Sequence, residues 1–445
     1  MKRIGIIGGG AAGMTAAIAA AGKGREVTIL EANDRLGKKI LATGNGKCNL
    51  GNEQLGPEEY YTGDTAFLER CLGRFGTSET LDFFGRLGLV VKSRGGYLYP
   101  ASEQAAGVLD VLRYEIAERS VKVVTGAHVE KISRDDKKNC ICVQAGDKRY
   151  SFDRVILACG GKAAPKTGSD GSGYSLAAQL GHSIVPTVPA LVQLKCREEY
   201  LKAVSGVRAQ AKIVVSCKGK PGRAEQPGAA QSIAEEQGEV QFTDYGISGI
   251  PVFQVSRQVN YWLLEKREVE VILDFFPDYD RESWEQLYIN RALLQGQRTV
   301  EEFFTGMLNK KLMLLFLKLA GLKPSEKAKE ADREKIKRVF SLCRCFTVHV
   351  VGNNGFENAQ VCAGGVPLSE LRENLESART PGVFFAGELL DVDGKCGGYN
   401  LQWAWCSGFL AGTAAAGETE EKSDRNQSGS KARSGRNGRD KKERY

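Results

Sequence analysis

The sequence predicts an α/β fold of Rossmann type whose chain is interrupted by an inserted domain. A glycine-rich hexapeptide at 8–13 stands between a buried-strand pattern and a helix pattern. Glycine-rich segments and a buried-strand pattern return near residue 355, whereas the region between carries alternating and helical patterns. A length of 445 residues is enough for two or three domains.

The N-terminal elements form a βαβ unit in this interpretation. Residues 3–7 have the pattern of a short buried strand, 11–21 that of a helix of small residues, and 27–30 that of a second buried strand. Further strands are expected at 121–124, 129–132 and 141–144, as a meander, and at 152–157.

The middle of the chain has a different character. Pro186 and Pro189 mark a boundary near residue 187, after which two strands, 211–217 and 239–242, flank a Pro/Gly-rich stretch predicted to be a long exposed loop. Helical spacing follows at 283–319 and 325–342, and the last elements are a strand at 383–385 and a helix at 401–416. The domains expected are 1–187 with 355–417, an insert at 188–354 whose helical part is about 283–342, and a tail at 418–445.

Charge and cysteine content restrict the function classes. The formal charge is +8, but residues 425–445 carry eight Lys/Arg and two acidic residues, so the rest of the chain is at +2. We therefore expect a disordered basic tail at 418–445 and no nucleic-acid partner for the body. Twelve scattered cysteines without a Cys-x-x-Cys pair, and no signal-peptide or membrane-span pattern, predict a cytoplasmic protein. Three dispersed histidines predict no metal centre.

The N-terminal glycines predict a dinucleotide site. Gly8 permits the tight turn, Gly10 lets the backbone approach a diphosphate, and Gly13 allows close packing of helix on strand. The phosphates would lie at the helix N-terminus, where free N–H groups favour anions. Glu31 closes the second strand at the position from which a carboxylate accepts ribose hydroxyls.

Two further blocks favour FAD over NAD as the bound cofactor. A basic, Gly-rich connection at 35–49 is long enough to run beside an extended cofactor. Near the other end, Gly397 and Gly398 begin the last helix, whose N-terminus would stabilise negative charge on a flavin pyrimidine ring. The predicted cofactor-binding residues are Gly8, Gly10, Ala11, Ala12, Gly13, Glu31, Lys38, Lys39, Asn45, Gly46, Cys48, Asn49, Val129, Gly160, Gly387, Glu388, Asp391, Gly398, Tyr399, Asn400 and Leu401.

The chain resembles the BaiN-type flavoproteins, bacterial FAD oxidoreductases. The resemblance spans about 3–417 and is carried, in order, by GGGAAG, LATGNGKCN, FTDYGISG, CAGGV and AGELLDVDGKCGGYNLQWAW. It implies a three-layer FAD domain built from both chain ends, interrupted by a β-rich and helical insert. Similar proteins are described as NAD(P)/FAD-dependent oxidoreductases or aminoacetone oxidases, and one member reduces double bonds of 3-oxo bile-acid intermediates. Two departures fall in the insert: Pro251 does not directly follow Gly249, and Asp244 stands where many relatives have His.

The function expected is reduction of a conjugated C=C bond, with NADH or NADPH as a transient electron donor, since no second dinucleotide domain is visible. The resemblance implies a bulky apolar 3-oxo-Δ4 or Δ4,6 steroid or bile acid. Tyr399, Asp244 and Tyr245 are the possible proton donors. Two alternatives are an FAD-dependent oxidase of a small amine and an RNA-associated flavoprotein anchored by its tail. The sequence leaves the oligomeric state and the choice between NADH and NADPH open.

Overall fold

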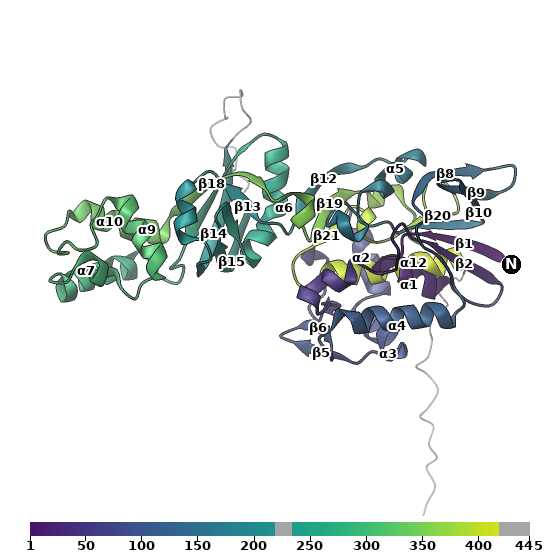
Figure 1. The fold of residues 1–445 in the computed structure, drawn as a ribbon, viewed down its shortest axis with the longest axis horizontal. Coiled ribbons are helices and arrows are strands. Elements are labelled where there is room, and N and C mark those ends of the chain that lie inside the picture. Colours follow the sequence, from purple (N-terminus) through teal and green to yellow (C-terminus); the bar gives the residue numbers. More distant parts are fainter. Residues whose placement is uncertain (219–233, 418–445) are drawn as a thin grey trace, which may run out of the picture.

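The computed structural model describes residues 1–218 and 234–417. Figure 1 shows three parts in line: a domain around a parallel sheet, a barrel, and a group of helices at the far end. The predicted tail at 418–445 and most of the predicted loop lie outside the described residues.

A five-stranded parallel sheet is the centre of the first domain. Its strands in spatial order are β20 (Val383–Phe385), β11 (Arg154–Leu157), β1 (Lys2–Ile7), β2 (Arg25–Leu30) and β7 (Lys122–Val124). Ile6 lies between Ile29 and Ile156 in register, and all three side chains are fully buried. Strands covered on both faces have continuous apolar runs, and this explains why the N-terminal βαβ unit was visible in the sequence.

Two helices from opposite ends of the chain pack closely on one side of this sheet (Figure 1). They are α1 (Ala11–Ala20) and α12 (Tyr399–Ala416). A Cβ added to Gly408 would lie 2.4 Å from the carbonyl oxygen of Ala12, and one added to Gly412 would lie 2.4 Å from that of Ala16. The two glycines therefore let the backbones approach, which a larger residue would prevent.

A three-stranded antiparallel sheet completes the layers: β8 (Val129–Asp135), β9 (Cys140–Ala145) and β10 (Lys148–Phe152). The predicted meander is therefore wrong in its first strand, because β7 pairs in parallel with β2. The predicted strand 152–157 is also divided, because β10 ends at Phe152 and β11 begins at Arg154; Asp153 lies between them and accepts the N–H of Arg3 at 2.8 Å. The expected α/β, Rossmann-like three-layer architecture is otherwise confirmed.

Smaller elements surround this domain. The short sheets are β3 (Gly51–Asn52) with β6 (Tyr97–Pro100) and β5 (Val91–Arg94), β4 (Tyr60–Thr62) with β21 (Val392–Gly394), and β12 (Val185–Ala190) with β19 (Val361–Gly365). The remaining helices are α2 (Thr65–Arg74), α3 (Thr77–Arg86), α4 (Ala105–Glu118), α5 (Ser172–Gln179) and α11 (Gly355–Asn358).

The β-rich part of the insert is a closed six-stranded barrel. Its strands in order are β13 (Leu194–Cys196), β16 (Gly246–Ser248), β15 (Ala234–Phe242), β14 (Arg208–Lys218), β17 (Glu268–Asp274) and β18 (Phe346–Asn353). The predicted loop is too long at its end, because 234–238 pairs with β14. The polar residues of that segment alternate between partly buried and exposed, as on a half-covered barrel face.

Helices form the rest of the insert. They are α6 (Ile250–Leu264), α7 (Arg281–Gln295), α8 (Val300–Phe304), α9 (Lys310–Ala320) and α10 (Arg333–Arg344). The predicted helical stretch 283–319 is three helices, and the Thr299 and Asn309 side chains cap the second and third. The barrel and helices share one hydrophobic core, separate from that of the parallel-sheet domain. The domain boundaries stay a prediction, which these two cores support. In the described parts of the chain, no helix is both long and apolar enough to cross a membrane.

Candidate functional site

The glycine-rich turn places the N-terminus of α1 at the carboxyl end of β1. Gly8 has φ +102°, and a Cβ there would lie 2.4 Å from the carbonyl oxygen of Ala158. A Cβ on Gly13 would lie 1.9 Å from the carbonyl oxygen of Gly8. A Cβ on Gly10, by contrast, would meet no atom within 4 Å. Gly8 and Gly13 are thus required by the fold, whereas Gly10 faces open space in front of the helix N-terminus.

Glu31 is fixed beside this turn. One carboxylate oxygen accepts the N–H of Gly9 at 2.7 Å, and the other accepts the backbone and side-chain N–H groups of Asn33, both at 2.7 Å. The oxygen that accepts from Gly9 keeps a lone pair for a ligand hydroxyl. Asn33 also accepts from Lys38, at 3.1 Å, so it is part of the site although the sequence analysis did not select it.

The C-terminal block meets the N-terminal block at two places. The position of a Cβ on Gly387 is 2.9 Å from the Cβ of Ala12. Glu388 forms an ion pair with Lys39 at 2.6 Å. Glu388 also accepts the N–H groups of Gly161 at 3.4 Å and Cys362 at 2.8 Å. Residues about 350 apart in the sequence are thus joined beside the turn that holds Gly10.

The second meeting point is at the start of α12. A Cβ on Gly398, where φ is +96°, would lie 2.7 Å from Oδ1 of Asn49. That oxygen is buried and has no hydrogen-bond partner. The side chain of Asn400 both donates to and accepts from the backbone of Gly394, at 2.7 and 2.8 Å, which holds the turn before the helix. A ring N–H of FAD would give the Oδ1 of Asn49 a hydrogen-bond partner, and the diphosphate of FAD would occupy the open space at Gly10. These residues therefore fit FAD.

The other predicted cofactor residues are spread around these two points. Asn45 and Gly46 both have left-handed backbones, with φ of 53° and 83°, and a Cβ on Gly46 would meet nothing within 4 Å. Asp391 is buried, and burial raises its carboxyl pKa above the ordinary value. Val129 begins β8 and is buried, and Leu401 follows Asn400 on α12. Their role as cofactor ligands stays a prediction.

The three possible proton donors lie on different domains. Tyr399 begins α12, where its carbonyl oxygen accepts the hydroxyl of Tyr60 at 2.9 Å. Asp244 and Tyr245 occupy the turn between β15 and β16, and the carbonyl oxygen of Tyr245 accepts the N–H of Cys196 at 2.9 Å within the barrel. Burial raises the pKa of the Tyr399 phenol to about 12, so it keeps its proton at neutral pH.

Thiol redox chemistry finds no support in the cysteines of the cofactor blocks. Burial raises the pKa of both Cys48 and Cys396 to about 12. Both are therefore protonated near neutral pH, whereas the reactive form of a cysteine is the thiolate. All twelve cysteines are unpaired thiols.

An ion pair that the sequence analysis missed joins the insert to the same region. Arg257 on α6 forms two hydrogen bonds, of 2.9 and 3.0 Å, with the Asp393 carboxylate on β21. The guanidinium carbon lies 4.5 Å from the ring centroid of Tyr61 and 5.0 Å from that of Tyr261. The signal was present, because Arg257 is the one charged residue in that 15-residue helix.

Other contacts of α6 extend this junction. Gln254 accepts the N–H of Cys396 at 2.8 Å, and Asn260 donates to the carbonyl oxygen of Pro189 at 2.7 Å. The insert therefore contacts the turn that leads to Gly397 and Gly398 through one helix. These contacts of α6 hold the insert next to the start of α12.

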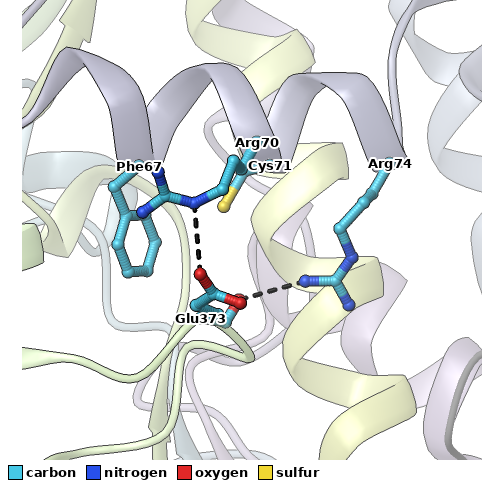
Figure 2. Close-up of a pocket in the computed structure, with 5 residues that line it drawn as sticks. All are labelled: Phe67, Arg70, Cys71, Arg74 and Glu373. Atoms are coloured by element: carbon cyan, nitrogen blue, oxygen red, sulfur yellow. Dashed lines mark hydrogen bonds and ion pairs between the residues drawn. The ribbon is translucent and has the colours of Figure 1, made fainter.

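The recesses on the surface of the described residues include two in the parallel-sheet domain. Figure 2 shows one, of about 210 Å³, where Arg70 lies 3.3 Å from Glu373 and Arg74 donates to its carbonyl oxygen at 3.0 Å. None of the predicted site residues lines it. The other, of about 310 Å³, is lined by Lys47, Arg94, Tyr97, Tyr99 and Glu103. It adjoins the 44–49 segment.

Among the residues that the structure describes, one group of side chains has metal-ligand chemistry. Asp135, Cys140 and Cys142 place their ligand atoms within 4.8 Å of one another on β8 and β9. Three groups are one fewer than a closed tetrahedral zinc site requires. The prediction from the sequence was that the protein has no metal centre.

Comparison with known proteins places this geometry in a family. Residues 2–414 match the HI0933-like protein Rossmann domain. The chain belongs to the HI0933-like family. It is 46% identical over 419 residues to a 3-dehydro-bile acid delta(4,6)-reductase of Clostridium scindens. The alignment covers 94% of this chain and 99% of the relative. The resemblance to BaiN-type flavoproteins is thereby confirmed.

A second relative has a name that indicates a different substrate. The chain is 28% identical over 411 residues to a ribosomal RNA dihydrouridine synthase of Haemophilus influenzae, covering 91% of this chain and 96% of the relative. Among solved structures, a 3-ketosteroid-Δ4-(5α)-dehydrogenase of Rhodococcus jostii is similar, with a TM-score of 0.45, 16% identity, and coverage of 93% and 97%.

Proposed function

We propose that this HI0933-like protein is an FAD-dependent oxidoreductase that reduces a conjugated C=C bond of a 3-oxo-Δ4 or Δ4,6 steroid or bile acid. NADH or NADPH is the proposed electron donor. The observation that carries the proposal is the joining of the two cofactor blocks, through Lys39 and Glu388 and through Asn49 and Gly398. The relative at 46% identity supports the substrate class.

The residues at these junctions have distinct tasks. The N-terminus of α1, left open by Gly10, binds the diphosphate, and Glu31 accepts ribose hydroxyls. The buried Oδ1 of Asn49 accepts a ring N–H, and the N-terminus of α12 stabilises negative charge. FAD, when bound, supplies the hydride-transfer chemistry.

The insert would hold the substrate at the junction. Arg257 and Gln254 fix α6 against β21 and the 396–398 turn, so that an apolar substrate is enclosed and water is excluded. Tyr399, whose phenol keeps its proton, is the proposed acid that protonates the α-carbon, and Asp244 and Tyr245 are the alternatives. A cytoplasmic location is part of the proposal, since all twelve cysteines are unpaired.

The names of the relatives support the reaction class independently of the substrate. A Δ4,6-reductase and a dihydrouridine synthase both add two hydrogens across a C=C bond that is conjugated with a carbonyl group. Orienting such a bond and polarising its carbonyl are therefore the shared requirements.

Anaerobic rapid mixing tests the proposal. Protein reduced with NADPH is mixed with 3-oxochola-4,6-dienoic acid, and the return of oxidised-flavin absorbance is followed together with a product two mass units heavier. Reoxidation by the dienone is the expected result. If the dienone causes no reoxidation and the protein rapidly forms peroxide from aminoacetone in air, the proposed reductase function is wrong and the amine oxidase function replaces it.

A second candidate is reduction of uridine in RNA, because two relatives at 27% and 28% identity are ribosomal RNA dihydrouridine synthases. The same reduced protein mixed with a ribosomal RNA fragment tests it. Formation of dihydrouridine there, with no reaction of the dienone, would favour this candidate.

A further inference from the structure

A hairpin beside the predicted flavin segment has one face of cations and aromatic rings. In the β5–β6 hairpin, Lys92 is opposite Tyr99 and Arg94 is opposite Tyr97, so all four side chains lie on the same face. Leu98 points to the other face and is buried. The hairpin therefore presents these four groups together.

This face adjoins residues assigned to the cofactor. The ring of Tyr97 lies 3.2 Å from the position of a Cβ on Gly397, and that of Tyr99 lies 3.8 Å from the corresponding position on Gly44. Asn52, which is paired with Tyr97 across the sheet, donates to the carbonyl oxygen of Gly397 at 3.1 Å. The 310 Å³ recess is thus next to both segments that face the proposed flavin ring.

The charges in the recess leave one cation without a partner. Glu103 forms ion pairs with Lys47 at 2.8 Å and with Lys92 at 2.9 Å. These two lysines lower the pKa of the Glu103 carboxyl to about 2, so it is ionised at neutral pH. Within residues 1–218 and 234–417, Arg94 forms no ion pair or hydrogen bond.

We infer that this recess receives the carboxylate of the substrate, with Arg94 as its ion-pair partner and Tyr97 and Tyr99 against the adjoining apolar ring system. The inference rests on the proposed function and names the substrate class more closely, as a ring-shaped apolar acid. A guanidinium binds a carboxylate through two parallel hydrogen bonds. The exposed part of Tyr97, 41% of the residue, supplies flat apolar surface beside it.

The charges of the recess favour an anionic ligand. Lys47 and Lys92 share Glu103, so these three groups leave one positive charge, and Arg94 brings the total to +2. A carboxylate bound to Arg94 offsets part of this charge without displacing either lysine from Glu103.

The test measures binding with the full-length FAD-loaded protein by titration calorimetry. The probes are 3-oxochol-4-en-24-oic acid, its methyl ester and NADPH. In Arg94→Gln the dissociation constant of the acid should rise about tenfold or more, while those of the ester and NADPH stay unchanged. Arg94→Lys should recover part of the affinity, because the charge returns without the two-pronged geometry.

Arg86→Gln is the matched control, since Arg86 is an exposed arginine of the same domain, and it should leave all three constants unchanged. Equal weakening of acid and ester, no weakening of either, or a loss confined to NADPH would each overturn the inference. If binding of the acid depends on Arg94 but the acid is not reduced, the inference about the recess stands and the proposed function is wrong. If the acid is reduced and its KM is unaltered in Arg94→Gln, the proposed function stands and the inference is wrong.

Discussion

Replacing Arg257 by Met tests the junction between the insert and the parallel-sheet domain. Met keeps much of the apolar stem and removes the charge, leaving Asp393 with its side chain only 2% exposed and without its partner. Burial raises the pKa of the Asp393 carboxyl to about 7, an increase that the Arg257 guanidinium opposes. Without Arg257 this pKa should rise further.

The size of the stability loss in Arg257→Met follows from the protonation state of Asp393. In the unfolded chain the pKa of an aspartate is about 3.9. Between about pH 4 and 7, Asp393 is therefore protonated in the folded wild type and ionised in the unfolded chain. The contribution of Asp393 to stability therefore falls by up to about 1.4 kcal/mol per pH unit in that window and is constant above it. In Arg257→Met the fall continues above pH 7.

The loss relative to wild type should thus grow with pH. Near pH 6, where Asp393 is largely neutral, we expect a loss of about 1 to 2 kcal/mol from hydrogen bonds and the contacts with Tyr61 and Tyr261. Near pH 8.5 the loss should reach about 3 to 4 kcal/mol, toward the cost of an unpaired buried charge.

Urea unfolding of both proteins, followed by tryptophan fluorescence between pH 5.5 and 8.5, measures this difference. Arg208→Met is the matched control, because its ion pair with Glu239 is exposed, and its effect should stay below about 1 kcal/mol without a pH trend. A loss from Arg257→Met that is the same at both ends of the pH range would refute a titrating, buried Asp393.

Three further predictions follow from the packing and the cofactor blocks. Gly10→Val should leave the thermal midpoint of the FAD-free protein within about 2 °C and reduce the FAD retained on purification by about tenfold or more, since its Cβ meets only open space; an unchanged FAD content contradicts this. Asn49→Leu should weaken FAD binding in a fluorescence titration without destabilising the FAD-free protein, because it removes an acceptor that has no partner; equal affinity for FAD contradicts it. Gly412→Ala should cost about 1 to 3 kcal/mol in thermal unfolding by separating α1 from α12, whereas Gly73→Ala, on open helix surface, should stabilise by about 0.5 to 1 kcal/mol; like effects contradict the packing argument.

Local signals explain what the sequence could predict. The βαβ unit and the positions of Gly8, Gly10 and Gly13 follow from steric requirements within a few residues. The start of α12 was also visible, because two glycines precede an apolar helix. The strand at 383–385 was recognisable by its apolar residues alone.

The missed features depend on residues far apart in the chain. Arg257 has its partner 136 positions away, so its role could be suspected from an otherwise uncharged helix but the partner could not be named. Closure of the barrel depends on β13 pairing with both β16 and β18, which an alternating pattern does not encode. Residues 234–238 have a loop-like composition and become a strand only because β14 lies beside them.

The most direct test of the account is the amount of FAD bound to the folded chain. Protein reconstituted with excess FAD and freed of unbound cofactor is denatured, and the released FAD is quantified by absorbance and chromatography against protein concentration. The account predicts a single FAD per chain in the wild type and a large loss in Gly10→Val. A folded wild-type chain that retains no FAD would contradict the claim that its two ends form one flavin site.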